Sequence, residues 1–91
     1  PNLGYHKIYK NSKRNLITPY SMFEQKSFYF AHSYSVNNFV EKNNEIFTID
    51  YKSKKILAFI KKNQIFGFQF HPELSGEIGL KFLDTYINSS T

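Results

Sequence analysis

The alternation of apolar and polar residues predicts a unit of short strands that ends in a helix. Residues 28–34 carry aromatic side chains on both faces, as in a strand that is covered on both sides. Residues 46–51 form a second apolar run, and residues 56–60 and 65–70 form a hairpin across a polar turn in which Asn63 tolerates a left-handed backbone. The sheet therefore contains at least one antiparallel pair.

The first 27 residues are irregular in pattern. Turn-forming residues dominate there, a short apolar patch occupies residues 20–23, and one short strand is expected around residues 7–9. We expect this region to be mostly loop.

After the hairpin, the period of the apolar residues becomes that of a helix. Ser75 suits the N-cap, and Glu77 places a negative charge in the first turn. The apolar residues of segment 76–87 share one stripe, made of Ile78, Phe82, Leu83, Tyr86 and Ile87. A terminal helix that packs on the sheet is therefore expected. Gly79 costs this helix about 1 kcal/mol relative to Ala, which suggests close approach to a strand or a partner.

Composition limits the classes of function. A chain of 91 residues makes at most one domain, and 41% hydrophobic residues, with ten Phe and seven Tyr, argue against disorder. The absence of Cys excludes disulfides, thiolate metal sites and a thiol nucleophile from this chain. The three His residues show no ligand spacing, so no metal or other cofactor is expected. No apolar run approaches the ~18 residues of a membrane helix, which favours a cytoplasmic protein.

The net charge of +5 is compatible with nucleic acid or with an acidic partner surface. However, only Arg14 among the 12 basic residues is Arg, the residue that usually provides bidentate recognition. Residues 64–71 partly match the aromatic strand of the RNA recognition motif, but fewer than half of its fixed positions agree. A small basic RNA-binding module is therefore an alternative, and nucleic acid is not the favoured partner.

The strongest candidate for chemistry is His71-Pro72-Glu73. Pro72 favours an extended His71, and residues two apart in an extended chain point the same way, so the imidazole and the carboxylate can meet. Such a pair is the base and its orienting group in a catalytic triad. The same residues also fit an ordinary ion pair at a strand end or a cap for the following helix. The nucleophile is missing, because the chain has neither Cys nor a Gly-x-Ser-x-Gly turn. His32, inside an aromatic strand, is expected to be structural.

Three segments together resemble a known family. Residues 67–80, Gly-Phe-Gln-Phe-His-Pro-Glu-Leu-Ser-Gly-Glu-Ile-Gly-Leu, resemble the Gln-Phe-His-Pro-Glu signature and the following helix of class I (triad) glutamine amidotransferases. The Ser-Gly-x-x-Gly-Leu continuation is most similar to the glutaminase subunits of imidazole glycerol phosphate synthases. Residues 28–34 resemble the aromatic-Val-His-Ser/Thr-Tyr strand of those subunits, and residues 1–6 resemble their Pro-x-Met-Gly-Trp-Asn loop. The resemblance spans essentially the whole chain.

The resemblance implies an α/β fold, with residues 1–91 as the C-terminal half of a three-layer glutamine amidotransferase domain whose nucleophile-bearing half is absent. In the family a Cys attacks the amide of glutamine, and His71 and Glu73 match the His and Glu that complete the triad. Ser33 and Tyr34 correspond to the strand that holds glutamine. Gly4 and Tyr5 correspond to a loop near the interface with the synthase.

The implied partners are the N-terminal half of the same domain and a synthase subunit that accepts the ammonia. The strongest resemblance, to the glutaminase of imidazole glycerol phosphate synthase, implies a role in histidine biosynthesis. The fragment alone is predicted to be inactive. Tyr5, His6 and Leu74 depart from the usual Trp, Asn and Lys of the family, which leaves the identity of the synthase open. A glutaminase that feeds a sugar-amidating enzyme of surface-glycan synthesis is an alternative, as is a pure interaction module that has kept a vestigial His-Glu pair.

Overall fold

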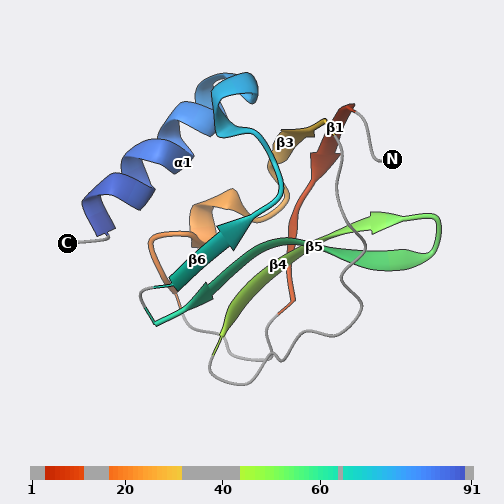
Figure 1. The fold of residues 1–91 in the computed structure, drawn as a ribbon, viewed down its shortest axis with the longest axis horizontal. Helices are drawn as coiled ribbons and strands as arrows, with labels where there is room; N and C mark the ends of the chain where they lie inside the picture. Colours follow the sequence, from red (N-terminus) through yellow and green to blue (C-terminus); the bar gives the residue numbers. More distant parts are fainter. Residues whose placement is uncertain (1–3, 12–16, 32–43, 64, 90–91) are drawn as a thin grey trace.

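Two antiparallel sheets and one helix meet around an aromatic core in the computed structural model of the chain, which describes residues 4–11, 17–31, 44–63 and 65–89 (Figure 1). A two-stranded sheet has the order β1-β3 and a four-stranded sheet the order β2-β4-β5-β6. The elements are β1 (Gly4–Lys7), β2 (Tyr9–Lys10), the 3-10 turn η1 (Ser21–Phe23), β3 (Ser27–Phe30), β4 (Glu45–Tyr51), β5 (Lys54–Lys62), β6 (Ile65–Phe68), the 3-10 turn η2 (Pro72–Leu74) and α1 (Gly76–Ser89).

The predicted combination of strands, antiparallel hairpin and terminal helix is confirmed. The β5–β6 hairpin turns through Asn63 at a φ of 57°, the left-handed conformation expected for it. A second hairpin joins β4 to β5 through Lys52 and Ser53, both with positive φ, as the right-handed twist of the flanking strands favours. No helix in the described ranges is both long and apolar enough to cross a membrane.

One strand was predicted around residues 7–9, but the structure has two there, because the chain crosses from one sheet to the other. β1 pairs with β3, whereas β2 pairs with β4. Between them, the buried Ile8 donates its N–H to the carbonyl of Lys26 at 3.0 Å. The irregular region also contributes more than loop, since Tyr20 and Phe23 around η1 are each only 1% exposed.

A β-bulge in β5 shapes the core. Phe47 of β4 is opposite Phe59, but the next residue, Thr48, is opposite Leu57, so Ala58 is the extra residue. The bulge lets two successive residues, Ala58 and Phe59, face the same core.

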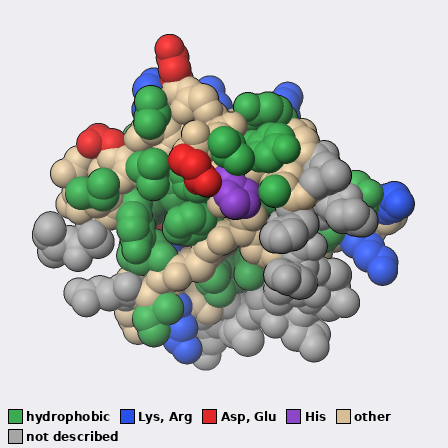
Figure 2. Space-filling view, turned by 45° about the horizontal axis from the view of Figure 1, so that its top comes forward, with side chains coloured by type: hydrophobic (Ala, Val, Ile, Leu, Met, Phe, Trp, Pro, Cys, Tyr) green, Lys and Arg blue, Asp and Glu red, His purple; other side chains and the backbone are tan. Residues whose placement is uncertain are grey.

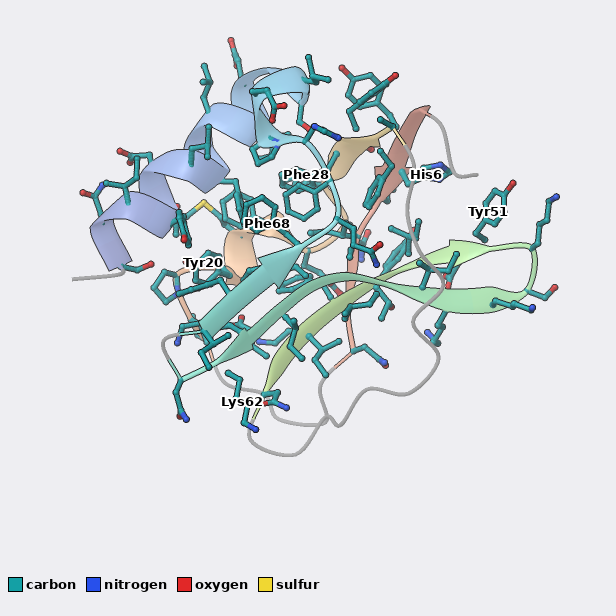
Figure 3. All side chains as sticks on the ribbon, viewed as in Figure 1. His6, Tyr20, Phe28, Tyr51, Lys62 and Phe68 are labelled. Atoms are coloured by element: carbon teal, nitrogen blue, oxygen red, sulfur yellow. The ribbon has the colours of Figure 1, made fainter. Side chains whose placement is uncertain are left out.

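Phe82 of α1 connects the helix to both sheets. Its ring lies 5.8 Å from that of Phe28 in β3 and 5.5 Å from that of Phe59 in β5, both edge to face. Figure 3 shows Phe28 and Phe68 between the helix and the strands. The predicted packing of the terminal helix on the sheet is therefore confirmed.

Candidate active site at the His-Pro-Glu turn

The His71-Pro72-Glu73 segment lies between the end of β6 and the start of α1. His71 is extended, with φ −106° and ψ 98°, as the following Pro favours. Its Nδ1 lies 3.0 Å from Oε2 of Glu73, so the predicted meeting of imidazole and carboxylate occurs. The two side chains are 39% and 61% exposed. Figure 2 shows a His side chain beside a carboxylate on a face with many apolar side chains.

The hydrogen bond defines the protonation of the pair. The bond from the imidazole, together with one from the backbone N–H of Glu73, lowers the pKa of the Glu73 carboxyl. An ionised carboxylate only accepts hydrogen bonds, so Nδ1 of His71 carries the hydrogen. In the neutral imidazole the free lone pair is then on Nε2. His71 is thus prepared to accept a proton at Nε2, and Glu73 to stabilise the resulting cation.

The backbone around His71 joins the two sheets. Gln69 donates its backbone N–H to the carbonyl of Ala58 at 2.9 Å and its side-chain amide to the carbonyl of Leu57 at 2.6 Å, both at the bulge of β5. Two residues later, His71 donates its N–H to the carbonyl of Tyr29 in β3 at 2.9 Å. The candidate base is therefore fixed where the sheets adjoin.

Ser75 serves the site in a way that sequence reasoning missed. Its carbonyl accepts a hydrogen bond from Gly79 N at 3.3 Å, in keeping with its position before the helix. Its hydroxyl, predicted as an N-cap, instead donates to the His71 carbonyl at 2.6 Å and accepts from Tyr29 N at 2.9 Å. The sequence signal that could have indicated this role is the serine directly after the His-Pro-Glu-Leu run.

Gly79 permits a close approach, but to the turn η2 rather than to a strand. A Cβ at this position would lie 1.9 Å from the carbonyl oxygen of Pro72, in η2. The expectation of contact with a strand was wrong, because the chain turns back on itself between η2 and α1 and places a backbone carbonyl against the helix.

Comparison with known proteins identifies the family. The sequence model described as "Glutamine amidotransferase class-I" matches residues 6–85. The chain belongs to this family.

Curated relatives are similar over most of this chain. Imidazole glycerol phosphate synthase subunit HisH 2 of Methanococcus maripaludis is 33% identical over 90 residues, which are 99% of this chain and 43% of the relative. Subunit HisH of Pelagibacter ubique is 33% identical over 97% of this chain and 40% of its own length. Subunit HisH of Oceanobacillus iheyensis is 41% identical over 72% of this chain and 32% of its own length. The chain thus spans less than half the length of the curated relatives that it matches.

The loop predicted to face a partner lies beside the His-Pro-Glu turn of this glutamine amidotransferase family member. Gly4 begins β1 at a φ of 106°, and Tyr5 follows it, 60% exposed. The Tyr5 hydroxyl donates to the carbonyl of Leu74 at 2.9 Å, and its ring packs edge-on against Tyr29 at 5.4 Å. The structure therefore brings Gly4 and Tyr5 next to η2.

The remaining predicted residues divide into two groups. Ser33 and Tyr34, predicted to hold glutamine, and His32 lie outside the described residues. His6 is packed edge-on against Phe30 and Tyr51, with ring centroids 5.7 and 6.1 Å apart (Figure 3). Within the described part of the chain, no three His, Cys, Asp or Glu side chains gather in a way that could hold a metal ion.

Proposed function

We propose that this chain supplies the base-bearing half of a class I glutaminase. Its residues 1–91 form the C-terminal half of the domain, and a Cys from the other half attacks glutamine. His71 and Glu73 complete the triad. The observation that carries the proposal is the 3.0 Å His71-Glu73 hydrogen bond on a turn anchored to both sheets, in a chain of the glutamine amidotransferase family.

The chemistry follows from the protonation of the pair. Nε2 of His71 takes the thiol proton, and the thiolate sulfur bonds to the amide carbon of glutamine. When the C–N bond breaks, His71 returns the proton to the leaving ammonia. Water then attacks the thioester, with His71 again as base, to release glutamate and the thiol. Throughout, the Glu73 carboxylate stabilises the imidazolium.

The acceptor of the ammonia is proposed from the relatives. They are named as subunits of imidazole glycerol phosphate synthase, which favours histidine biosynthesis over surface-glycan amidation. The partner would then be the ammonia-accepting synthase subunit, reached from the face that carries Gly4 and Tyr5. Glutamine would lie against Ser33 and Tyr34, and the protein would act in the cytoplasm without a cofactor.

The packing of the aromatic residues disfavours the RNA-binding alternative. Recognition of single-stranded RNA needs aromatic rings that are free to stack on bases. Phe66 instead packs on Tyr86 of α1 at 5.0 Å, and Phe68 packs on Phe82 at 5.3 Å. The rings of Phe66 and Phe68 are thus engaged with side chains of the helix, and Phe68 remains 36% exposed.

The proposal is tested by complementation. The part of the Methanococcus maripaludis relative that precedes its matched segment is added to this chain, and release of ammonia from glutamine is measured. We expect activity from the pair and none from this chain alone. His71→Ala should lower the activity at least about 1,000-fold, since removal of one triad member disables the unit.

The matched control is His6→Asn, which removes a different imidazole and introduces the residue usual in the family. Its activity should stay within about threefold of the original. Normal turnover by the His71→Ala variant would overturn the proposal. Binding of the two halves without any glutaminase activity would instead favour an interaction module with a vestigial pair.

A further inference from the structure

Ser75 closes a ring of three hydrogen bonds with the backbones of His71 and Tyr29. Its hydroxyl accepts from Tyr29 N at 2.9 Å and donates to the carbonyl of His71 at 2.6 Å. The ring closes where His71 N donates to the carbonyl of Tyr29 at 2.9 Å. Ser75 is only 3% exposed, so these bonds are shielded from competition by water.

The ring satisfies the free edge of β3. Tyr29 is opposite Tyr5 in the β1–β3 pair, yet both polar groups of its backbone bind the His71–Ser75 segment. Such outward-pointing groups belong to the non-hydrogen-bonded positions of an antiparallel ladder. Ser75 thus supplies with its side chain the acceptor, and His71 supplies with its N–H the donor, that a further strand would have supplied with its backbone.

The backbone of His71 is held on both sides. Its N–H is bound to β3, and its carbonyl accepts from both Leu74 N at 3.1 Å and the Ser75 hydroxyl. The imidazole, by contrast, is 39% exposed and has its hydrogen bond to Glu73, which is on the same turn. The position of the base relative to the sheets is therefore set through its backbone.

The turn from His71 to Ser75 is rigid, which makes the connection between His71 and β3 stiff. Ser75 N donates to the Pro72 carbonyl at 3.0 Å, and that carbonyl also fills the space where a Cβ of Gly79 would lie. The peptide units between His71 and Ser75 have little room to move without disturbing the start of α1. Loss of the Ser75 hydroxyl would leave the Tyr29 N–H without this acceptor and the His71 carbonyl without one of its two donors.

We propose that Ser75 is a positioning residue, which fixes the base His71 to β3 through its hydroxyl and so sets the geometry of proton transfer. The inference rests on the proposed glutaminase function. Misplacement of a reacting group by about 1 Å can cost about 100-fold in rate, whereas substrate binding by other residues is unaffected. Ser75 should therefore act on kcat rather than on KM.

The test compares Ser75→Ala with Ser89→Ala in the complemented glutaminase. Ser89 is the matched control, because it loses one hydroxyl contact, to Tyr20 at 2.9 Å, at the far end of the same helix. We expect kcat to fall about 10- to 100-fold in Ser75→Ala, with KM for glutamine changed less than about threefold. Ser89→Ala should change kcat less than about twofold. Equal kcat values in the two variants would overturn the proposal.

Hydrogen exchange gives a second readout that needs no activity. The Tyr29 amide of the unsubstituted protein should exchange slowly, and at least about tenfold faster in Ser75→Ala. Rapid exchange in the unsubstituted protein would overturn the proposal even if the variant does not fold. Failure of the proposed glutaminase function is recognised separately, by the absence of activity from the complemented pair or by full activity of His71→Ala. Neither result alters the exchange expected for the Tyr29 amide.

Discussion

At the scale of single residues, the geometry of the His71-Glu73 pair determines which imidazole nitrogen carries the hydrogen and which carries the free lone pair. Glu73 accepts from Nδ1, so the free lone pair of the neutral imidazole is on Nε2. The two residues are adjacent to a Pro, and this local arrangement needs no distant part of the chain. The pair was accordingly predictable from three residues.

The ionisation of Glu73 gives a prediction for acid pH. Because its pKa is lowered in the folded protein, the folded state binds fewer protons here than the unfolded chain. The stability that this adds is present above the unfolded pKa and is lost as the pH falls through the lowered value. A carbon-detected NMR titration should place the midpoint of Glu73 below the ~4.3 of a model peptide. In His71→Ala the midpoint should move back up, and an unchanged midpoint would contradict the assigned cause.

At the scale of elements, the contact between η2 and α1 depends on Gly79. Gly79→Ala would normally favour a helix by about 1 kcal/mol, but here the new Cβ would meet the Pro72 carbonyl at 1.9 Å. Backbone cannot yield as a flexible side chain does, so the steric effect should dominate. We expect a net loss of about 1–3 kcal/mol in the free energy of unfolding, measured by urea denaturation followed by circular dichroism.

Thr85→Ala is the control for Gly79→Ala. Thr85 lies in the same helix, and its hydroxyl hydrogen bond, to the Lys81 carbonyl, is exposed. Its substitution should change the free energy of unfolding by no more than about 0.5 kcal/mol. A Gly79→Ala variant as stable as the original would show that η2 and α1 are not in contact in solution.

The other elements differ in how well their patterns specified them. The helix has a strong 3.6-residue period and was predicted to within two residues of its end, at Ser89. β1 and β2 were merged in the prediction, because a change of sheet at Ile8 leaves no mark in a run of alternating residues. The bulge at Ala58 was likewise invisible, since it depends on the register with β4.

At the scale of the whole molecule, stability depends on aromatic rings from distant segments. Phe82 is 1% exposed and contacts the rings of Phe28 and Phe59 from two different sheets. Phe82→Ala should lower the free energy of unfolding by about 3–5 kcal/mol through loss of burial and formation of a cavity. Because net stabilities are only about 5–15 kcal/mol, this change removes a large share of the total and should lower the thermal midpoint markedly.

Ile87→Ala is the control for Phe82→Ala. Ile87 lies on the same helix but is 63% exposed, so its loss should matter far less. The measurement is the thermal midpoint by circular dichroism. Equal midpoints for the two variants would mean that the helix does not pack as described.

The sequence by itself determined the local features of this protein: the terminal helix, the hairpin turn at Asn63, the His71-Glu73 pair and the family to which the chain belongs. Each depends on residues that are near one another in the chain, so local backbone preferences and periodicity suffice. Only the tertiary structure decided what holds the pair in place. Gln69 binds the bulge of β5, and Ser75 and His71 bind Tyr29 of β3. These bonds join segments up to 46 residues apart, and their partners are backbone groups, which every residue carries and no sequence pattern distinguishes.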